Sequence, residues 1–183
     1  MRIIGGTFKG RRFNPPANKW PTRPTTDYAK EALFNILYNR LDFESLKVLD
    51  LFGGTGNHSY EWISRGCRSV TYVDQFAPAV AFAKKISATL QIEEFIQIHK
   101  AEVFKFIQKD SNTYDLIFAD PPYEMPLLHT LPDRILEGNL LDQEGLFILE
   151  HSPKNDFKEH PAFQEMRSYG GTIFSFFLHP GKS

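Results

Sequence analysis

From Leu46 onward, short apolar runs alternate with segments of helical periodicity, and this alternation limits the possible folds more than any other feature of the chain. The apolar runs predict strands at residues 47–51, 69–74, 95–99, 114–119 and 146–151. The segments between them predict helices at residues 59–65, 78–90, 103–108 and 126–137. Because strands that alternate with helices form βαβ units, we predict an α/β fold with a mostly parallel sheet.

The two ends of the chain depart from this alternation. Residues 163–169 and 172–178 are joined by Gly170-Gly171, which leaves no room for a helix and predicts a hairpin. The final strand is therefore expected to be antiparallel to its neighbour and to end the sheet. Residues 26–41 have the apolar spacing of an amphipathic helix, with Thr25 or Thr26 as its cap.

Length and composition predict a single domain over residues 1–183, with an N-terminal extension at 1–25 and the core at 26–183. Cys67 is the only cysteine, so an internal disulfide is excluded and a reducing compartment is favoured. No early stretch resembles a signal peptide, and no apolar run approaches the roughly 18 residues of a membrane span. We therefore expect a cytoplasmic protein.

Charge is unevenly distributed along the chain. The overall net charge of −1 argues against a generic nucleic-acid binder. Residues 1–30, however, carry seven lysines and arginines against one aspartate, a net of +6, which leaves −7 for the remainder. Such a basic arm concentrates phosphate contacts on one face, although it is equally a pattern of solvated, fraying termini. Glycines and prolines discourage a helix in residues 1–20, which we expect to be β-rich or partly mobile.

A glycine-rich turn follows the first predicted strand and leads into a helix. In this position it normally cradles a nucleotide-like cofactor, although a plain tight turn is the alternative. Gly54 and Gly56 are followed by Ser59, where a dinucleotide fingerprint requires a third glycine. Asp50, at the strand tip, suits a cationic ligand such as a sulfonium amino acid better than a pyrophosphate.

Acidic residues also lie at the end of the second predicted strand and just beyond the third. Asp74, which precedes Gln75, is placed to hold both hydroxyls of a ribose, a group that NAD and S-adenosylmethionine share. Phe76 is a candidate for packing on adenine. Glu102 is a candidate for accepting from the adenine amine, or is simply an acid at a helix N-terminus.

The fourth predicted strand ends in Asp120-Pro121-Pro122-Tyr123, which places a carboxylate, a rigid turn and an aromatic ring at one strand tip. The Asp120 carboxylate and the Pro121 carbonyl are suited to accept the two hydrogens of an exocyclic amine, while Tyr123 stacks on the ring that carries it. An ordinary strand exit is the alternative interpretation.

Taken together, these motifs resemble the class I S-adenosylmethionine-dependent methyltransferases, and among them the RsmD-like 16S rRNA guanine-N2 methyltransferases. The resemblance spans almost the whole chain, from Arg2-Ile3-Ile4-Gly5-Gly6 to the Asp120–Tyr123 motif. It implies a Rossmann-like sheet of seven strands with helices on both faces. It also implies cofactor contacts at Asp50, Gly53, Gly54, Gly56, Asp74 and Glu102, and a target amine at Asp120 and Tyr123.

Two departures from the family pattern accompany this resemblance. Asn57-His58-Ser59-Tyr60 is bulkier and more polar than the small and aliphatic residues usual after the glycine loop. Glu102 stands where aspartate or asparagine is commoner.

The expected reaction is methyl transfer to a guanine N2 amine without a metal, since the six histidines lack the spacing of a metal site. The expected partner is 16S rRNA or a small ribosomal subunit particle, bound by a monomer. The arm residues expected to contact RNA phosphates are Arg2, Lys9, Arg11, Arg12 and Arg23. Three alternatives stay open: another amine target, namely adenine N6 or a protein glutamine amide, an NAD-binding oxidoreductase, and a non-catalytic RNA-binding module.

Overall fold

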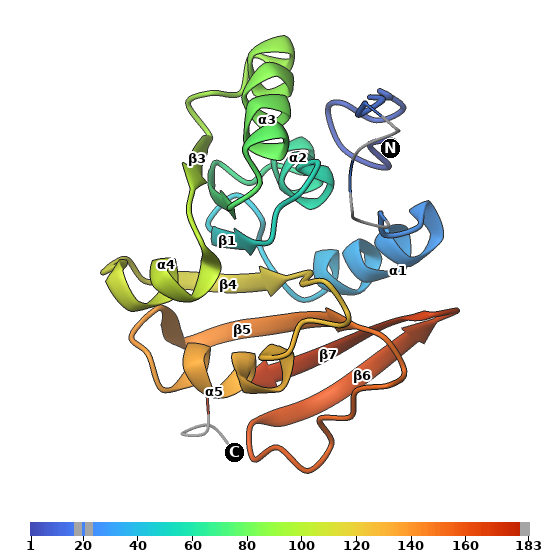
Figure 1. Ribbon diagram of the computed structural model, residues 1–183. Helices are drawn as coiled ribbons and strands as arrows, with labels where there is room; N and C mark the ends of the chain where they lie inside the picture. The colour runs from blue at the N-terminus through green and yellow to red at the C-terminus, as the bar shows by residue number, and fades with distance from the viewer. Residues whose placement is uncertain (17–19, 21–23, 180–183) are drawn as a thin grey trace.

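The computed structural model describes residues 1–16, 20 and 24–179, which contain one sheet of seven strands in the order β3-β2-β1-β4-β5-β7-β6 (Figure 1). The strands are β1 (Lys47–Leu51), β2 (Ser69–Asp74), β3 (Ile96–Lys100), β4 (Tyr114–Ala119), β5 (Leu141–His151), β6 (Phe163–Tyr169) and β7 (Thr172–Leu178). The first five are parallel, and β7 is antiparallel to both β5 and β6. The predicted α/β fold with an antiparallel C-terminal hairpin strand is confirmed.

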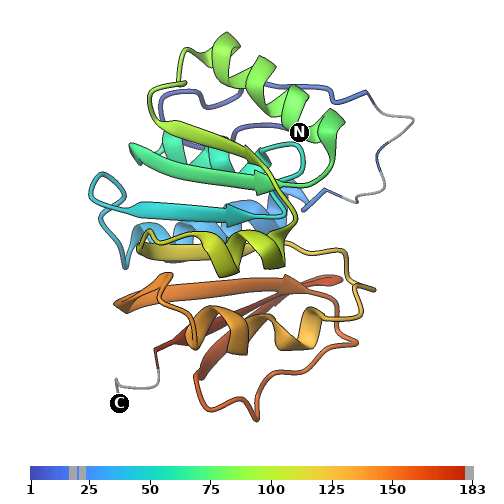
Figure 2. The ribbon, with the colours of Figure 1, turned by 60° about the vertical axis from the view of Figure 1, so that its left-hand side comes forward.

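Helices cover both faces of this sheet, as Figure 2 shows. They are α1 (Asp27–Tyr38), α2 (Asn57–Ser64), α3 (Ala77–Leu90), α4 (Val103–Lys109) and α5 (Leu131–Leu136), the last preceded by a 3₁₀ turn, η1 (Leu128–Thr130). Successive strand residues point to opposite faces. Val48 thus belongs to the core under α1, α2 and α3, whereas Leu49 belongs to the core under α4 and α5.

Several predicted boundaries and one predicted strand position are wrong. The helix predicted over 26–41 ends at Tyr38, and the helix predicted over 59–65 begins at Asn57 and ends at Ser64. β5 begins at Leu141 instead of residue 146, because a register shift lets Leu141 pair with Tyr114 across the polar stretch. The helix predicted over 126–137 begins only at Leu131, after the 3₁₀ turn. The last strand, β7, lies inside the sheet, and β6 forms the edge. Burial explains this exchange, because β7 is almost wholly buried whereas β6 carries polar, partly exposed side chains.

The N-terminal extension is predicted to be β-rich or partly mobile, but its described part is mostly turns, bends and irregular backbone, with a single antiparallel bridge between Arg2 and Arg12. The extension is fixed to α2 by the buried Glu61, whose carboxylate accepts hydrogen bonds from the backbone N–H groups of Ile4 and Gly5, each at 2.9 Å. Glu61 also forms a fully buried ion pair with Lys30 of α1, at 3.1 Å. The buried Glu61 carboxylate of α2 therefore joins this helix to the extension and to α1.

Within the described residues, none of the helices has the length and apolar character needed to cross a membrane.

Candidate active site

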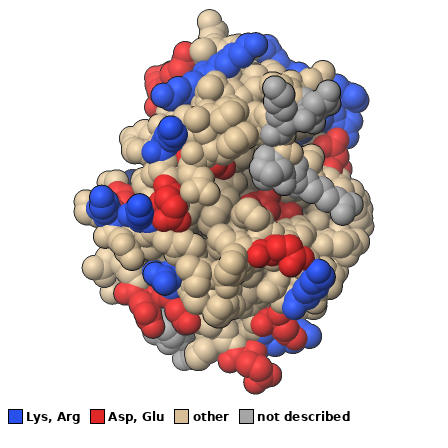
Figure 3. Space-filling model, in the orientation of Figure 1, with Lys and Arg blue, Asp and Glu red and all other residues tan. Residues whose placement is uncertain are grey.

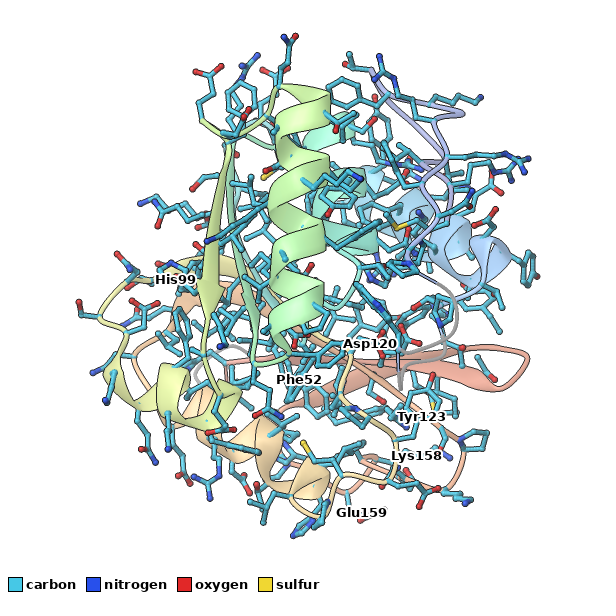
Figure 4. All side chains as sticks on the ribbon, turned by 45° about the horizontal axis from the view of Figure 1, so that its top comes forward. Phe52, His99, Asp120, Tyr123, Lys158 and Glu159 are labelled. Carbon is cyan, nitrogen blue, oxygen red and sulfur yellow. The ribbon has the colours of Figure 1, made fainter. Side chains whose placement is uncertain are left out.

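The carboxyl ends of the central strands border two adjoining cavities of about 830 and 380 Å³. Parallel α/β sheets bind their ligands at this edge. Four residues line both cavities: Trp20, Phe52, Gly54 and Asp120. Figure 4 shows Asp120 beside Phe52. Asp120 therefore lies where a ligand in one cavity would meet a ligand in the other.

The loop after β1 depends on glycine for its shape. A Cβ atom on Gly53 would come within 2.3 Å of the Tyr72 ring, and one on Gly56 within 2.3 Å of the Tyr60 ring. Phe52 takes a positive φ of 60°, which is rare for a bulky side chain and marks a strained position. The inner side of the loop therefore packs closely against Tyr72 and Tyr60. Its outer side faces the cavities, where a ligand can approach the backbone.

Asp74 holds this loop and the start of α3 at once. One carboxylate oxygen accepts from the N–H of Gly54 at 2.9 Å, and the other accepts from the N–H of Phe76 at 2.8 Å. Asp74, Gln75 and Phe76 all line the larger cavity. Trp20 of the extension contacts the Phe76 ring edge-on, with ring centroids 5.9 Å apart. The predicted ribose and adenine residues are therefore brought together.

Glu102 lies across the larger cavity, at the N-terminus of α4. Its two carboxylate oxygens accept from the N–H groups of Phe104 and Lys105, each at 3.0 Å. The side chain thus acts as a helix cap, one of its two predicted roles, while also lining the cavity.

Asp50 and Gly56 are not among the residues that line either cavity. The Asp50 side chain is buried beneath the loop, where it accepts a hydrogen bond from the Ser59 hydroxyl at 2.5 Å. Burial raises the pKa of Asp50 to about 7, although the Ser59 hydrogen bond opposes this. Asp50 acts on the loop and on any ligand above it through its charge.

The Asp120–Tyr123 segment leaves the sheet beside β1, where the Asp120 N–H donates to the Leu51 carbonyl at 3.3 Å. Pro121 is buried, and Pro122 lines the larger cavity. Tyr123 lines neither cavity; its hydroxyl donates to Glu150 of β5 at 2.9 Å. The structure thus brings Asp120 to both cavities and leaves the Tyr123 ring to one side.

Three carboxylates with raised pKa values surround the junction of the cavities. Burial is the main cause of the raised pKa in all three residues, Asp50, Glu150 and Asp120. It raises the pKa of Glu150 to about 7. The pKa of Asp120 lies well above its usual range, because the negative charges of Glu150 and Asp50 add to the effect of burial. Among the described residues, no ion pair neutralises any of the three. This charge distribution favours a cationic ligand.

The predicted RNA-binding residues lie on or near the extension. Lys9, Arg11 and Arg12 are exposed, whereas Arg2 forms an ion pair with Asp27 at 3.1 Å. Arg23 lies outside the described residues. In Figure 3 basic side chains gather along the upper rim of the molecule, and acidic ones near its centre and base.

Five residues that border the site were not predicted as site residues from the sequence: Thr25, Phe52, Trp20, His58 and Glu150. His58 is buried and lines the smaller cavity, and its Nε2 atom has no hydrogen-bond partner within the described structure. Glu150 alone carried a local signal, since a glutamate directly after Leu146-Phe147-Ile148-Leu149 is a charge in a buried strand.

The described residues contain no group of three histidine, cysteine, aspartate or glutamate side chains that could hold a metal ion.

The strand order with a reversed β7 and the acidic glycine loop after β1 define a Rossmann-like class I methyltransferase fold. The solved structure "Putative methyltransferase yhhF from Escherichia coli" superposes with a TM-score of 0.83 at 24% identity, covering 98% of this chain and 97% of that one. Residues 1–178 match the family described as "Conserved hypothetical protein 95". The chain belongs to this family, the RsmD-like methyltransferases.

Two relatives are named "Ribosomal RNA small subunit methyltransferase D". That of Buchnera aphidicola is 33% identical over 150 residues, covering 82% of this chain and 75% of the relative. That of Haemophilus influenzae is 30% identical over 153 residues, covering 82% of this chain and 78% of the relative.

Proposed function

We propose that this protein transfers a methyl group from S-adenosylmethionine to the exocyclic N2 amine of a guanine in 16S rRNA. The observation that carries the proposal is the acidic junction of the two cavities, where Asp120 borders both and no described cation balances the buried carboxylates. A cationic methyl donor in the larger cavity would balance the negative charge of the carboxylates. A neutral amine in the smaller cavity would lie beside Asp120.

The residues present fit this cofactor. Asp74 would hold the ribose, Phe76 and Trp20 would enclose the adenine, and the Gly53–Gly56 loop would accommodate the amino-acid end. When bound, S-adenosylmethionine supplies an electrophilic methyl group on a positively charged sulfur. Asp50 would favour that charge from beneath the loop, and the product would be S-adenosylhomocysteine.

Asp120 and the Pro121 carbonyl would orient the target amine. The lone pair of a guanine N2 amine is delocalised into its ring, which makes the nitrogen a poor nucleophile. Two fixed acceptors would bind its hydrogens, bend the nitrogen towards tetrahedral geometry and stabilise the positive charge that develops on it. This positioning needs no metal. The Tyr123 ring lines neither cavity, so a base extruded from its RNA helix would meet this ring beside the smaller cavity and not within it.

The relatives named as small subunit rRNA methyltransferases support 16S rRNA, free or in a subunit particle, as the partner. An rRNA substrate also supports a cytoplasmic location, and we propose that the enzyme acts as a monomer. Asp120 favours a nucleobase over the glutamine amide, because enzymes that act on glutamine usually carry asparagine at this position. Adenine N6 is the remaining amine target.

Calorimetric titration distinguishes this proposal from an NAD-binding oxidoreductase. We expect micromolar binding of S-adenosylhomocysteine and no detectable binding of NAD, because the loop lacks the third glycine of a dinucleotide site. Binding of NAD alone would overturn the proposal.

The affinity for S-adenosylmethionine should depend on pH. Asp50 and Glu150 have pKa values of about 7 in the free protein, so below pH 7 a cation must displace protons from the site. We expect calorimetry to show affinity falling by up to about tenfold per pH unit from pH 7 to pH 5.5. Adenosine, which carries no positive charge, is the matched control and should bind equally at both pH values. If the affinities for S-adenosylmethionine and adenosine changed equally with pH, this electrostatic account would be contradicted.

Arg11 and Arg12 should contribute to RNA affinity through phosphate contacts. For Arg11→Glu or Arg12→Glu, we expect weaker binding of 16S rRNA fragments and a reduction of about one in the slope of log affinity against log salt. Filter binding from 50 to 300 mM salt measures this slope. Lys109→Glu, at the end of α4 away from the site, should leave it unchanged. Unaltered slopes in the arginine variants would mean that the extension does not contact RNA.

A further inference from the structure

Glu150 is an ionisable residue in the apolar interior of β5. Its side chain is 2% exposed, and no described lysine, arginine or histidine forms an ion pair with it. Ala119 pairs with Leu149 across the parallel strands, so Asp120, the first residue after β4, lies near Glu150, the next residue of β5. A buried carboxylate without a cation is costly, which indicates a purpose other than stability.

Two hydroxyl groups bind the two oxygens of Glu150 separately. The Thr25 hydroxyl donates to Oε2 at 2.7 Å, and the Tyr123 hydroxyl donates to Oε1 at 2.9 Å. Thr25 precedes α1 and lines the smaller cavity, whereas Tyr123 belongs to the loop after β4. Glu150 thus joins the rim of the smaller cavity to the loop that carries Asp120.

The charge of Glu150 also acts on Asp120. Burial and then the charge of Glu150 raise the pKa of Asp120, and a hydrogen bond with Thr25 lowers it. The other titratable groups that face this pair are Asp50 of β1, Tyr123, and His58 of α2. Burial lowers the pKa of His58 to about 3, so its ring is neutral and offers no compensating charge. The ionised form of one carboxylate therefore disfavours ionisation of the other.

We propose that Glu150 is a positioning residue of the methyl-transfer site, which fixes the loop of Tyr123 against Thr25 and determines the pH range in which Asp120 is ionised. This inference rests on the proposed function, because an ionised Asp120 is the acceptor that the amine hydrogens require. Because two hydroxyl donors favour the ionised form of Glu150, its charge keeps a proton on Asp120 to higher pH and so delays the ionisation that makes Asp120 an acceptor.

Glu150→Gln tests the inference with little change in shape. Its amide oxygen can still accept from Tyr123, and its NH₂ group can donate to the Thr25 oxygen, but the negative charge is lost. Removing a like charge lowers the pKa of its neighbour. In ¹³C NMR titrations of the ligand-free protein, with Asp120 assigned from Asp120→Asn, we expect the apparent pKa of Asp120 to fall by at least one unit. The control Glu159→Gln, at an exposed position after β5, should leave it unchanged.

The pH profile of methyl transfer provides the second measurement. In Glu150→Gln the acidic limb of kcat/KM should move to lower pH by the same amount as the NMR pKa. An unchanged Asp120 titration in a folded Glu150→Gln protein would overturn the inference. If no RNA is methylated by the unmodified protein, the proposed function fails, whereas the NMR titration still decides how Glu150 acts on Asp120.

Thr25→Val covers the case in which Glu150→Gln does not fold. Valine matches threonine in shape but removes a donor that favours the ionised form of Glu150, so the NMR pKa of Glu150 should rise. The pKa of Asp120, which Thr25 also lowers, should rise with it. Titrations of both groups that match the unmodified protein would overturn the inference.

Discussion

Asp120→Ala is expected to lower kcat/KM for methyl transfer by about 10³-fold, while the affinity for S-adenosylhomocysteine changes by less than about threefold. Loss of one fixed polar group that stabilises developing charge typically costs a factor of this size. Cofactor affinity should persist, because Asp74, and not Asp120, provides the hydrogen bonds that hold Gly54 of the glycine loop and Phe76. Single-turnover assays combined with calorimetry separate the two effects.

Asp120→Asn is the matched variant for this test. Asparagine keeps the size of the side chain and one acceptor oxygen but lacks the negative charge. We expect an activity between those of the alanine variant and the unmodified enzyme. Full activity in Asp120→Ala would remove Asp120 from the reaction, and equal loss of activity and of cofactor affinity would assign it to cofactor binding.

Lys30→Met should destabilise the protein by about 2–3 kcal/mol, because it removes the fully buried cation paired with Glu61 and leaves only Arg65, at 2.8 Å, to compensate the carboxylate. The Lys30 ammonium also donates to the Arg2 carbonyl at 2.6 Å and to Asn57 Oδ1 at 2.7 Å. Loss of these bonds should loosen the extension against α2 and weaken cofactor binding as a consequence. Urea unfolding, read by the fluorescence of the buried Trp62, measures the change.

Lys154→Met is the matched control for this substitution. Its ion pair with Glu124 has a similar length, 2.9 Å, but both side chains are about four-fifths exposed. Solvent screens such a pair, so we expect no change in the unfolding midpoint. Equal effects of the two substitutions would mean that the core ion pair does not hold the extension in place.

The fold was largely predictable because its signals are local. Strands β1, β2, β4, β6 and β7 follow from short apolar runs and appear at the predicted residues. The position of β7 inside the sheet was not predictable from the hairpin alone, since either strand of a hairpin can pair with β5. Burial decides it: Phe176 packs in the core on one face of β7 and Phe177 in the core on the other, whereas Glu165 of β6 tolerates an edge.

The site was less predictable, because its contacts join distant parts of the sequence. Gly53 in the turn after β1 and Asp74 at the end of β2 belong to motifs that are recognisable in the sequence, and the structure brings both to the cavities. Thr25, by contrast, meets Glu150 from 125 positions away, and no local pattern marks it. Lys30 is misleading in the sequence, where it belongs to the basic arm. In the structure its side chain is buried and forms an ion pair with Glu61.

The most direct test is to incubate the protein with labelled S-adenosylmethionine and 16S rRNA, free or in 30S particles, from a strain that lacks the enzyme, and then to identify the labelled nucleoside by mass spectrometry. The account predicts a single N2-methylguanosine, absent from reactions with Asp120→Ala. Labelled N6-methyladenosine, labelled protein, or no transfer to either form of the rRNA would contradict it.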